Sequence, residues 1–312
     1  MKKLISLVLA VLMCLSLVSF ASAESTGAEI AIVLKTLGNP FWETMKSGIQ
    51  AKADELGVKV DIFAATSEDD VEGQLTILEN AVSKGYKAIG VAPLSPTNLN
   101  NVIAQAMKDG IYVVIIDEKV DVDALKALGG NVMGFVTTNN VAVGKLAGED
   151  ICKKLPDGGE VAIIEGKAGN ASGLDRRNGA EEAFKAQSNI TLVESQPADW
   201  DRTKAYDVAT NYITKHPELK AIYCCNDTMA MGALEAVKAA GASIMVYGTD
   251  GNDDAVASVQ AGELAGTVAQ DPAGIGARAF EMLVNMVKDK TPIDLTADVP
   301  VEYVAAKLIV KE

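Results

Sequence analysis

Polar side chains recur at the carboxyl ends of the predicted strands, and their types suit hydrogen bonding better than bond breaking. Carboxylates accept hydrogen bonds, lysine donates them, and amides do both. Helix capping explains any one of these residues alone, and for Asp227 it is our preferred interpretation. Several such residues around one crevice favour a ligand with many hydroxyl groups. The set consists of Lys35, Asn39, Asp117, Glu118, Asn226, Asp250 and Gln270.

The sequence offers little for catalysis. Its single histidine, His216, lies in a polar run that we expect to be exposed at the end of a helix, and no G-x-S-x-G motif is present. Zinc sites need clustered His and Cys, whereas Cys224 and Cys225 are adjacent. No phosphate-binding glycine loop follows any predicted strand. We therefore predict a protein that is not an enzyme and uses no cofactor or metal.

Both tryptophans of the chain, Trp42 and Trp200, stand at predicted starts of helices. Phe41 and Trp42 are adjacent, so they point about 100° apart on a helix and cannot share one core-facing stripe. One of them is expected to face the crevice; the alternative places Phe41 in the core and Trp42 as an anchor on the helix face. Trp200 either contacts a ligand or packs as a hydrophobic staple before a helix that starts near Asp201. Flat rings suit the C–H faces of a polyhydroxylated ring, and we favour the ligand contact for Trp200.

Apolar runs and helical patterns alternate from residue 29 onward, which predicts parallel sheets with helices on both faces. Two sets of similar order, separated by a break at 121–131, indicate two similar doubly wound lobes. The predicted helices of the first set cover about 40–56, 68–84 and 96–109. The predicted strands cover 29–35, 58–64, 88–93, 112–118, 134–138, 160–166, 191–196, 221–226, 244–249 and 265–270.

Residues 1–23 combine a basic start, an apolar stretch and a small-residue cleavage site, so we predict a signal peptide that is removed on export. The formal charge of −14 for the whole chain becomes −16 once the two leader lysines are lost. Such a charge disfavours nucleic acids and anionic membranes as partners. Three cysteines then remain, Cys152, Cys224 and Cys225, an odd number that predicts small buried residues and no disulfide framework.

The mature chain resembles the periplasmic binding proteins for monosaccharides, in the branch of ribose-binding and related proteins. The resemblance implies an α/β fold of two doubly wound parallel-sheet lobes joined by a three-segment hinge, with crossings near 119–137, 270 and 301. It places 24–137 plus 271–300 in the N-terminal lobe and 138–270 plus 301–312 in the C-terminal lobe. The stretches that carry it are Lys35–Trp42, Ile116–Lys119, Glu165–Gly173, Gln196–Arg202, Asn226–Gly232, Gly248–Gly251 and Val268–Gln270.

The resemblance also assigns roles to residues. Arg176 rather than Arg177 is expected at the ligand, because the family pattern is Arg followed three residues later by Gly, here Gly179. The asparagine that precedes proline on the third strand of the family is Ala92 here, so that contact is missing. Phe41, Trp42 and Trp200 are expected to sandwich the sugar ring. Lys35, Asn39, Asp117, Arg176, Asn226, Asp250 and Gln270 are expected to bind its hydroxyls, with Glu118 as a further candidate.

Four of these positions differ from ribose binders, which carry Ser at Lys35, Phe at Trp42 and Trp200, and Arg at Glu118. Larger rings and a different charge favour an aldohexose such as D-allose; ribose, psicose and a furanosyl signal such as autoinducer-2 stay open as alternatives. The implied function is capture of the sugar by hinge closure and delivery to the membrane permease of an ABC importer.

The same resemblance implies a monomer in the periplasm or on the outer face of a single-membrane cell, and leaves open whether a chemoreceptor is also a partner. Sugar-responsive repressors share the two-lobe fold. Those repressors need a basic N-terminal helix-turn-helix, whereas this chain starts with a predicted export signal and has a charge of −16 without it.

Overall fold

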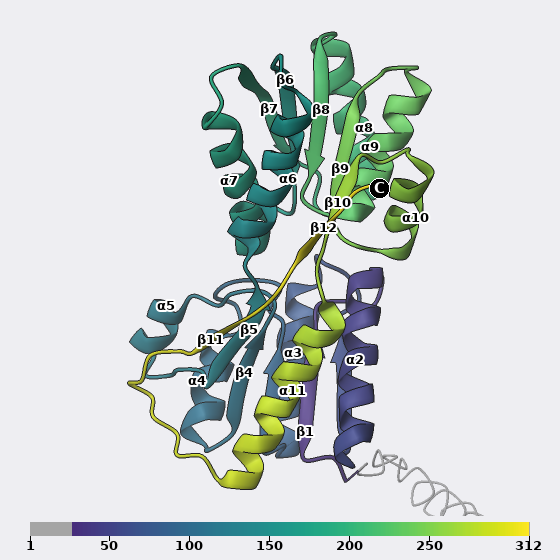
Figure 1. Cartoon of the computed structure of the whole chain (residues 1–312). Coiled ribbons are helices and arrows are strands. Elements are labelled where there is room, and N and C mark those ends of the chain that lie inside the picture. Colours follow the sequence, from purple (N-terminus) through teal and green to yellow (C-terminus); the bar gives the residue numbers. More distant parts are fainter. Residues whose placement is uncertain (1–26, 312) are drawn as a thin grey trace, which may run out of the picture.

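The computed structural model describes residues 27–311, so the predicted signal peptide lies outside the described residues. The described part forms two α/β lobes, one above the other, each built on a six-stranded sheet (Figure 1). Among the described helices, none is long and apolar enough to cross a membrane. The predicted fold class is confirmed.

The sheet of the N-terminal lobe has the order β11-β5-β4-β3-β1-β2, and all its neighbours are parallel. Its central strands are short apolar runs buried on both faces, as is typical of sheets covered by helices on two sides. The strands are β1 (Ile30–Leu34), β2 (Val60–Ala64), β3 (Ala88–Val91), β4 (Tyr112–Ile116), β5 (Gly134–Thr138) and β11 (Val301–Val304).

Two separate clusters of buried side chains cover the faces of this sheet. α2 and α11 pack together on one face, although α11 comes from the end of the chain, and α3, α4 and α5 lie on the other (Figure 1). The helices are α2 (Pro40–Leu56), α3 (Val71–Lys84), α4 (Asn100–Lys108), α5 (Val122–Ala127) and α11 (Pro272–Asp289).

The C-terminal lobe repeats this plan with the order β12-β10-β9-β8-β6-β7. It is parallel apart from β12, which runs antiparallel to β10 at the edge. In both lobes the strand order reverses beside the first strand, β1 or β6, and ligands bind beyond the strand ends at such points. The strands are β6 (Gly159–Glu165), β7 (Ile190–Pro197), β8 (Leu219–Cys224), β9 (Met245–Asp250), β10 (Gly266–Ala269) and β12 (Lys307–Ile309).

One continuous cluster of buried side chains forms the core of this lobe. α6 packs on α7, and α8 packs on α9, with α10 beside α9. The helices are α6 (Asn140–Lys154), α7 (Ala171–Lys185), α8 (Arg202–Lys215), α9 (Asp227–Ala239) and α10 (Asp253–Ala261).

The chain passes between the lobes three times: between β5 and α6, between β10 and α11, and between β11 and β12 (Figure 1). The last crossing corrects the predicted boundary. Residues 301–304 were assigned to the C-terminal lobe, but they form β11, which pairs with β5 and completes the sheet of the N-terminal lobe. Only the part from β12 onward reaches the other sheet. β11 is short and half exposed, so its sequence carries no strong strand pattern.

The helix starts are set by side-chain caps. α2 starts at Pro40, and Asn39 Oδ1 accepts the Phe41 N–H at 3.0 Å, which confirms the predicted start. α3 starts at Val71 with Asp70 as its cap, three residues later than predicted, which leaves Glu68 in the preceding loop.

The preferred interpretation of Asp227 as a cap is wrong. Asn226 caps α9, whereas the Asp227 carboxylate accepts the Asn252 N–H and the Thr267 hydroxyl. Asp227 thereby links the segment after β9 to β10.

Candidate sugar-binding site

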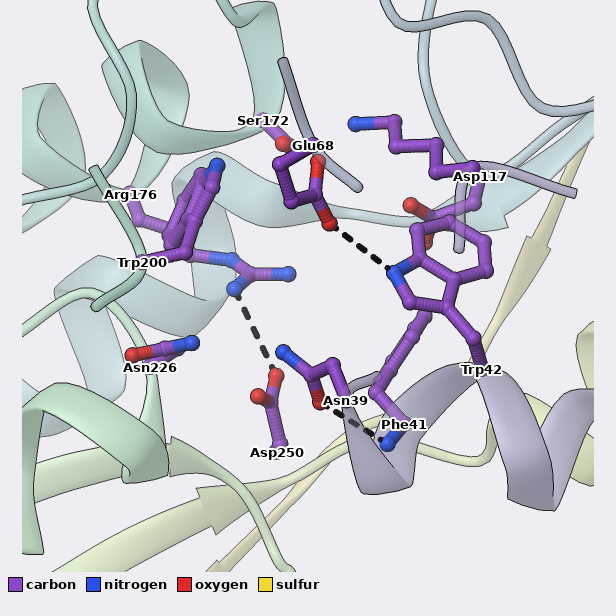
Figure 2. A pocket seen from close by; sticks show the side chains of 11 residues that line it. Asn39, Phe41, Trp42, Glu68, Asp117, Ser172, Arg176, Trp200, Asn226 and Asp250 are labelled. Atoms are coloured by element: carbon purple, nitrogen blue, oxygen red, sulfur yellow. Dashed lines mark hydrogen bonds and ion pairs between the residues drawn. The ribbon is translucent and has the colours of Figure 1, made fainter. Parts of the chain in front are cut away.

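A cavity lies between the two lobes, with an empty volume of about 340 Å³ that includes the space open to solvent. Side chains from both lobes point into it (Figure 2). Nine of the eleven predicted residues line the cavity, together with two that were not predicted. The lining residues are Lys35, Asn39, Phe41, Trp42, Glu68, Asp117, Ser172, Arg176, Trp200, Asn226 and Asp250.

Phe41 and Trp42 form the aromatic wall of the N-terminal lobe. Both line the cavity and both are about 5% exposed or less, so neither ring is confined to the core of the lobe. Their rings meet edge to face, with centroids 5.0 Å apart and planes at 81°. Trp42 Nε1 donates to Glu68 Oε1 at 3.1 Å, which fixes the indole from its polar edge.

Trp200 forms the opposite wall, across the cavity from Trp42 (Figure 2). Its ring lies directly on Gly166, where an added Cβ would come within 2.0 Å of the indole, so only glycine leaves room for it. Trp200 Nε1 donates to Asn170 Oδ1 at 3.0 Å. The contact with Gly166 and the hydrogen bond to Asn170 together fix the orientation of the Trp200 ring at the edge of the cavity.

A buried cluster of charges lies on the N-terminal side. Lys35 is 3% exposed, and its Nζ lies 3.3 Å from Glu118 Oε2. Burial alone lowers the pKa of Lys35, but Glu118, with Glu68 and Asp117, outweighs it and keeps the pKa above its ordinary value. Burial raises the pKa of Asp117 to about 6, although Lys35 and Arg176 oppose the rise. Lys35 therefore stays protonated at neutral pH and can donate hydrogen bonds. Asp117 Oδ1, by contrast, accepts no hydrogen bond from the described residues.

Arg176 reaches the cavity from α7 of the C-terminal lobe. Its Nε donates to Asn140 Oδ1 at 2.8 Å and its Nη1 donates to the Cys225 carbonyl at 2.8 Å; the same Nη1 lies 3.5 Å from Asp250 Oδ1. Burial raises the pKa of Asp250, and Arg176 opposes that rise. α6 and α7 can approach closely enough for this network because Gly179 leaves room: an added Cβ would lie 2.0 Å from a carbonyl of α6.

The neighbouring arginine behaves differently. Arg177 points away, has a third of its side chain exposed and pairs with Glu165 at 3.7 Å. Of the two arginines, Arg176 is the one that lines the cavity.

Strained backbone is concentrated at the cavity. Among the described residues, five that are not glycine have positive φ angles, and four of them are Asp117, Asp199, Trp200 and Asp250. Such conformations cost roughly 1–3 kcal/mol each and persist where the surrounding structure enforces them. Three of these residues, Asp117, Trp200 and Asp250, line the cavity, so the strained backbone sets the directions of their side chains at a cost in stability.

Two predicted residues, Glu118 and Gln270, do not line the cavity but stand directly behind it. Gln270, at the crossing between β10 and α11, donates from Nε2 to Asp250 Oδ1 at 2.7 Å. Glu118 contacts Lys35 on one side and Ser172 of the other lobe on the other. Both hold cavity-lining residues in place.

Sequence reasoning missed Glu68 and Ser172. Glu68 was interpreted as part of a helix start, and Ser172 lies inside a stretch that was noted only for the resemblance. A signal for Glu68 was present: it follows the second strand of the lobe, beside the first, where side chains converge on the switch point.

The remaining chemistry candidates lie elsewhere. His216 was predicted to be exposed, but only 18% of its side chain is, because it lies between Glu194, at 3.2 Å, and Glu160, at 3.7 Å. Cys224 and Cys225 are buried and unbridged, and Cys152 is partly buried. In the described part of the chain, no group of three or more His, Cys, Asp or Glu residues is placed to hold a metal ion.

Two lobes around a cavity with aromatic walls and buried charges define a two-lobed solute-binding protein. The sequence model of the family described as the periplasmic binding protein domain matches residues 30–291, and the chain belongs to this family.

The relatives agree. The D-allose-binding periplasmic protein of Escherichia coli is 55% identical over 278 residues, which cover 88% of this chain and 89% of that protein. The ribose import binding protein of Haemophilus influenzae is 38% identical, over 95% of this chain and 98% of that protein.

A similar structure is also known. An ABC transporter periplasmic solute binding protein from Actinobacillus succinogenes, solved with bound D-allose, superimposes with a TM-score of 0.84 at 31% identity. The match covers 90% of this chain and 97% of that one. The expected membership of the monosaccharide-binding family is thereby confirmed.

Proposed function

We propose that this protein captures a monosaccharide, D-allose or a similar aldohexose, by closing its two lobes over the sugar. The observation that carries the proposal is the placement of Trp42 and Trp200 on opposite lobes, with Lys35, Asp117 and Arg176 between them. Aromatic faces cover the C–H faces of a pyranose ring, while charged groups bond to its hydroxyls. The eleven residues predicted from sequence, with Glu68 and Ser172 added, form the proposed site and its support.

Unmet hydrogen bonds support a polyhydroxylated ligand. Within the described residues, Asp117 Oδ1 and Glu68 Oε2 are buried without a partner. A buried acceptor without a donor costs about 1–3 kcal/mol, and a hydroxyl of the sugar supplies the donor. Since an epimer leaves one such group unpaired, we expect it to bind at least about tenfold more weakly.

The family supports a role in sugar transport: the closed form presents its sugar to the membrane permease of an ABC importer. We propose that the chain is exported through a cleaved signal peptide, acts in the periplasm as a monomer and catalyses no reaction. The sugar then leaves the protein unchanged.

Isothermal titration tests this function. The mature protein is stripped of bound sugar by unfolding and refolding, then titrated with D-allose, D-ribose, D-glucose, D-galactose and D-psicose. We expect micromolar or tighter binding of D-allose and weak binding of D-ribose. Preference for D-ribose would contradict the proposed specificity, and no binding of any sugar would contradict the function itself.

A further inference from the structure

Glu118 belongs to the N-terminal lobe, yet its carboxylate is bonded to the first turn of a helix in the C-terminal lobe. Glu118 Oε1 accepts the Ser172 N–H at 3.1 Å, and Oε2 accepts the Ser172 hydroxyl at 2.7 Å. Lys119 N–H donates to Oε1 at 3.2 Å, and Lys35 lies at 3.3 Å from Oε2. The Glu118 side chain is 3% exposed, so these donors take the place of water around its carboxylate.

The helix that Glu118 contacts lacks a cap of its own. Asn170 occupies the cap position of α7, but its side chain makes no capping hydrogen bond. Instead it accepts from Trp200 Nε1 and donates weakly to the Leu94 carbonyl at 3.4 Å. A helix start exposes unpaired N–H groups and a partial positive charge, which a carboxylate stabilises. Glu118 therefore occupies the position that a local cap usually fills.

We propose that Glu118 caps α7 from the opposite lobe and so stabilises the closed form without touching the sugar. The proposal rests on the proposed function, because it assigns Glu118 a role in closure over the sugar that needs no contact between Glu118 and the sugar. When the lobes separate, α7 loses its cap and Glu118 keeps only its contacts within the N-terminal lobe. Closure thus gains hydrogen bonds that are the same for every ligand.

Such a residue sets affinity but not selectivity. The apparent dissociation constant equals the intrinsic one divided by the fraction of protein in the closed, binding-competent form. Loss of the cap lowers that fraction equally for all sugars. Loss of a group that contacts hydroxyls, by contrast, changes the ratio between sugars.

Ser172→Ala is the cleanest variant: Ser172 lines the cavity, but its hydroxyl donates its proton to Glu118 Oε2, so the change removes that bond and leaves the Ser172 N–H bond and the Lys35–Glu118 pair intact. We expect it to weaken binding of the two tightest sugars of the panel by the same factor, about tenfold, since a hydrogen bond to a charged group is lost. Glu118→Gln should weaken both at least as much, and the double variant should be little worse than Glu118→Gln alone, because both changes remove the same contact.

The matched control is Asp175→Asn. Lys119 and Asp175 also join the lobes, at 2.6 Å, but 51% and 23% of their side chains are exposed. Exposed ion pairs contribute little, so we expect a change of less than about threefold. An unchanged affinity in Ser172→Ala, additive effects in the double variant, or an altered ratio between the sugars would overturn the trans-lobe cap.

Small-angle scattering separates this proposal from the proposed function. In the sugar-free state, Glu118→Gln should have a larger radius of gyration than the wild type, because the closed form loses the cap. Saturating sugar should bring both to the same closed value. If no sugar binds or compacts the wild type, the proposed function fails; the cap then stands only if the sugar-free radii differ, and equal radii overturn it too.

Discussion

At the scale of single residues, the cavity holds buried charged side chains that depend on a few specific partners. Arg176 illustrates this: it is 4% exposed and holds Asn140, the Cys225 carbonyl and Asp250 in one network. Its guanidinium also lies 5.8 Å from the Trp200 ring. Removing a partner from such a network leaves a buried charge without compensation.

We expect Arg176→Met to abolish sugar binding and to destabilise the C-terminal lobe by about 3–5 kcal/mol, because Asn140, the Cys225 carbonyl and Asp250 all lose their buried donor. The matched control is Arg177→Met, which removes an arginine at the next position that pairs with Glu165 near the surface. That variant should lose no more than about 1 kcal/mol and keep its affinity. Urea unfolding and titration calorimetry measure both quantities; equal effects of the two variants would contradict the role of Arg176.

Asp117 makes binding depend on pH. Burial raises the pKa of Asp117 to about 6, so below pH 6 this carboxyl takes up a proton and can no longer accept two hydroxyls. Since the raised pKa belongs to an acid, the binding contribution of its anion is present above pH 6 and lost as the pH falls through that value.

We expect the ratio of wild-type affinity to that of Asp117→Asn to fall about tenfold from pH 7 to pH 5. The asparagine variant does not titrate there, so it removes from the comparison the pH effects of other groups, Asp250 included. Dissociation constants at pH 5, 6, 7 and 8 measure the ratio. A ratio independent of pH would show that Asp117 is ionised throughout or does not contact the sugar.

At the scale of elements, one helix holds the strand ends that carry the site. Gln74 of α3 is 1% exposed, and its Nε2 donates to the Ala92 carbonyl at 2.8 Å and the Leu34 carbonyl at 3.3 Å. Its Oε1 accepts the Leu94 N–H at 2.8 Å. One amide thus satisfies backbone groups just past the ends of β1 and β3, where the ladder between the strands stops.

Gln74→Leu should destabilise the N-terminal lobe by about 3 kcal/mol, because it leaves buried backbone groups without partners. It should also weaken sugar binding, since Lys35 follows the released Leu34 carbonyl. Gln50→Leu is the control: Gln50 is exposed on α2 and bonds only to Asp54 among the contacts described, so we expect a change within about 0.5 kcal/mol. Similar losses in thermal stability for the two variants would contradict this account.

At the scale of the whole molecule, each lobe has its own core, and the lobes meet through the cavity, a few polar contacts and the three crossings. The lobes can therefore move as rigid bodies, and a ligand that touches both favours the closed form.

A bound sugar should stabilise both lobes at once. At a hundredfold excess over the dissociation constant the gain is about 2.7 kcal/mol. For a chain of this size we expect a rise in the melting temperature of roughly 5–10 °C with D-allose, measured by calorimetry. An acyclic hexitol at the same concentration is the control, because it offers hydroxyls without ring faces for the tryptophans. An equal rise with the hexitol would contradict recognition of the ring.

The sequence alone determined the elements and most of the site. Apolar runs with polar ends are local patterns, so the alternation of strands and helices, and the start of α2 at Asn39 and Pro40, follow from neighbouring residues. Nine lining residues were also predicted, because strand ends converge in a parallel sheet, because the aromatic residues suited a ligand, and because the resemblance supplied Arg176.

Only the tertiary structure decided how these parts meet. It assigned Val301–Val304 to the N-terminal sheet, because pairing of an edge strand depends on which sheet lies nearby and not on its own residues. It showed that Glu118 bonds to the start of α7 and does not line the cavity, and that Glu68 accepts a hydrogen bond from Trp42. Both contacts join segments that are far apart in the chain. Local patterns carry no information on such long-range contacts, which arise only when both lobes are folded and closed.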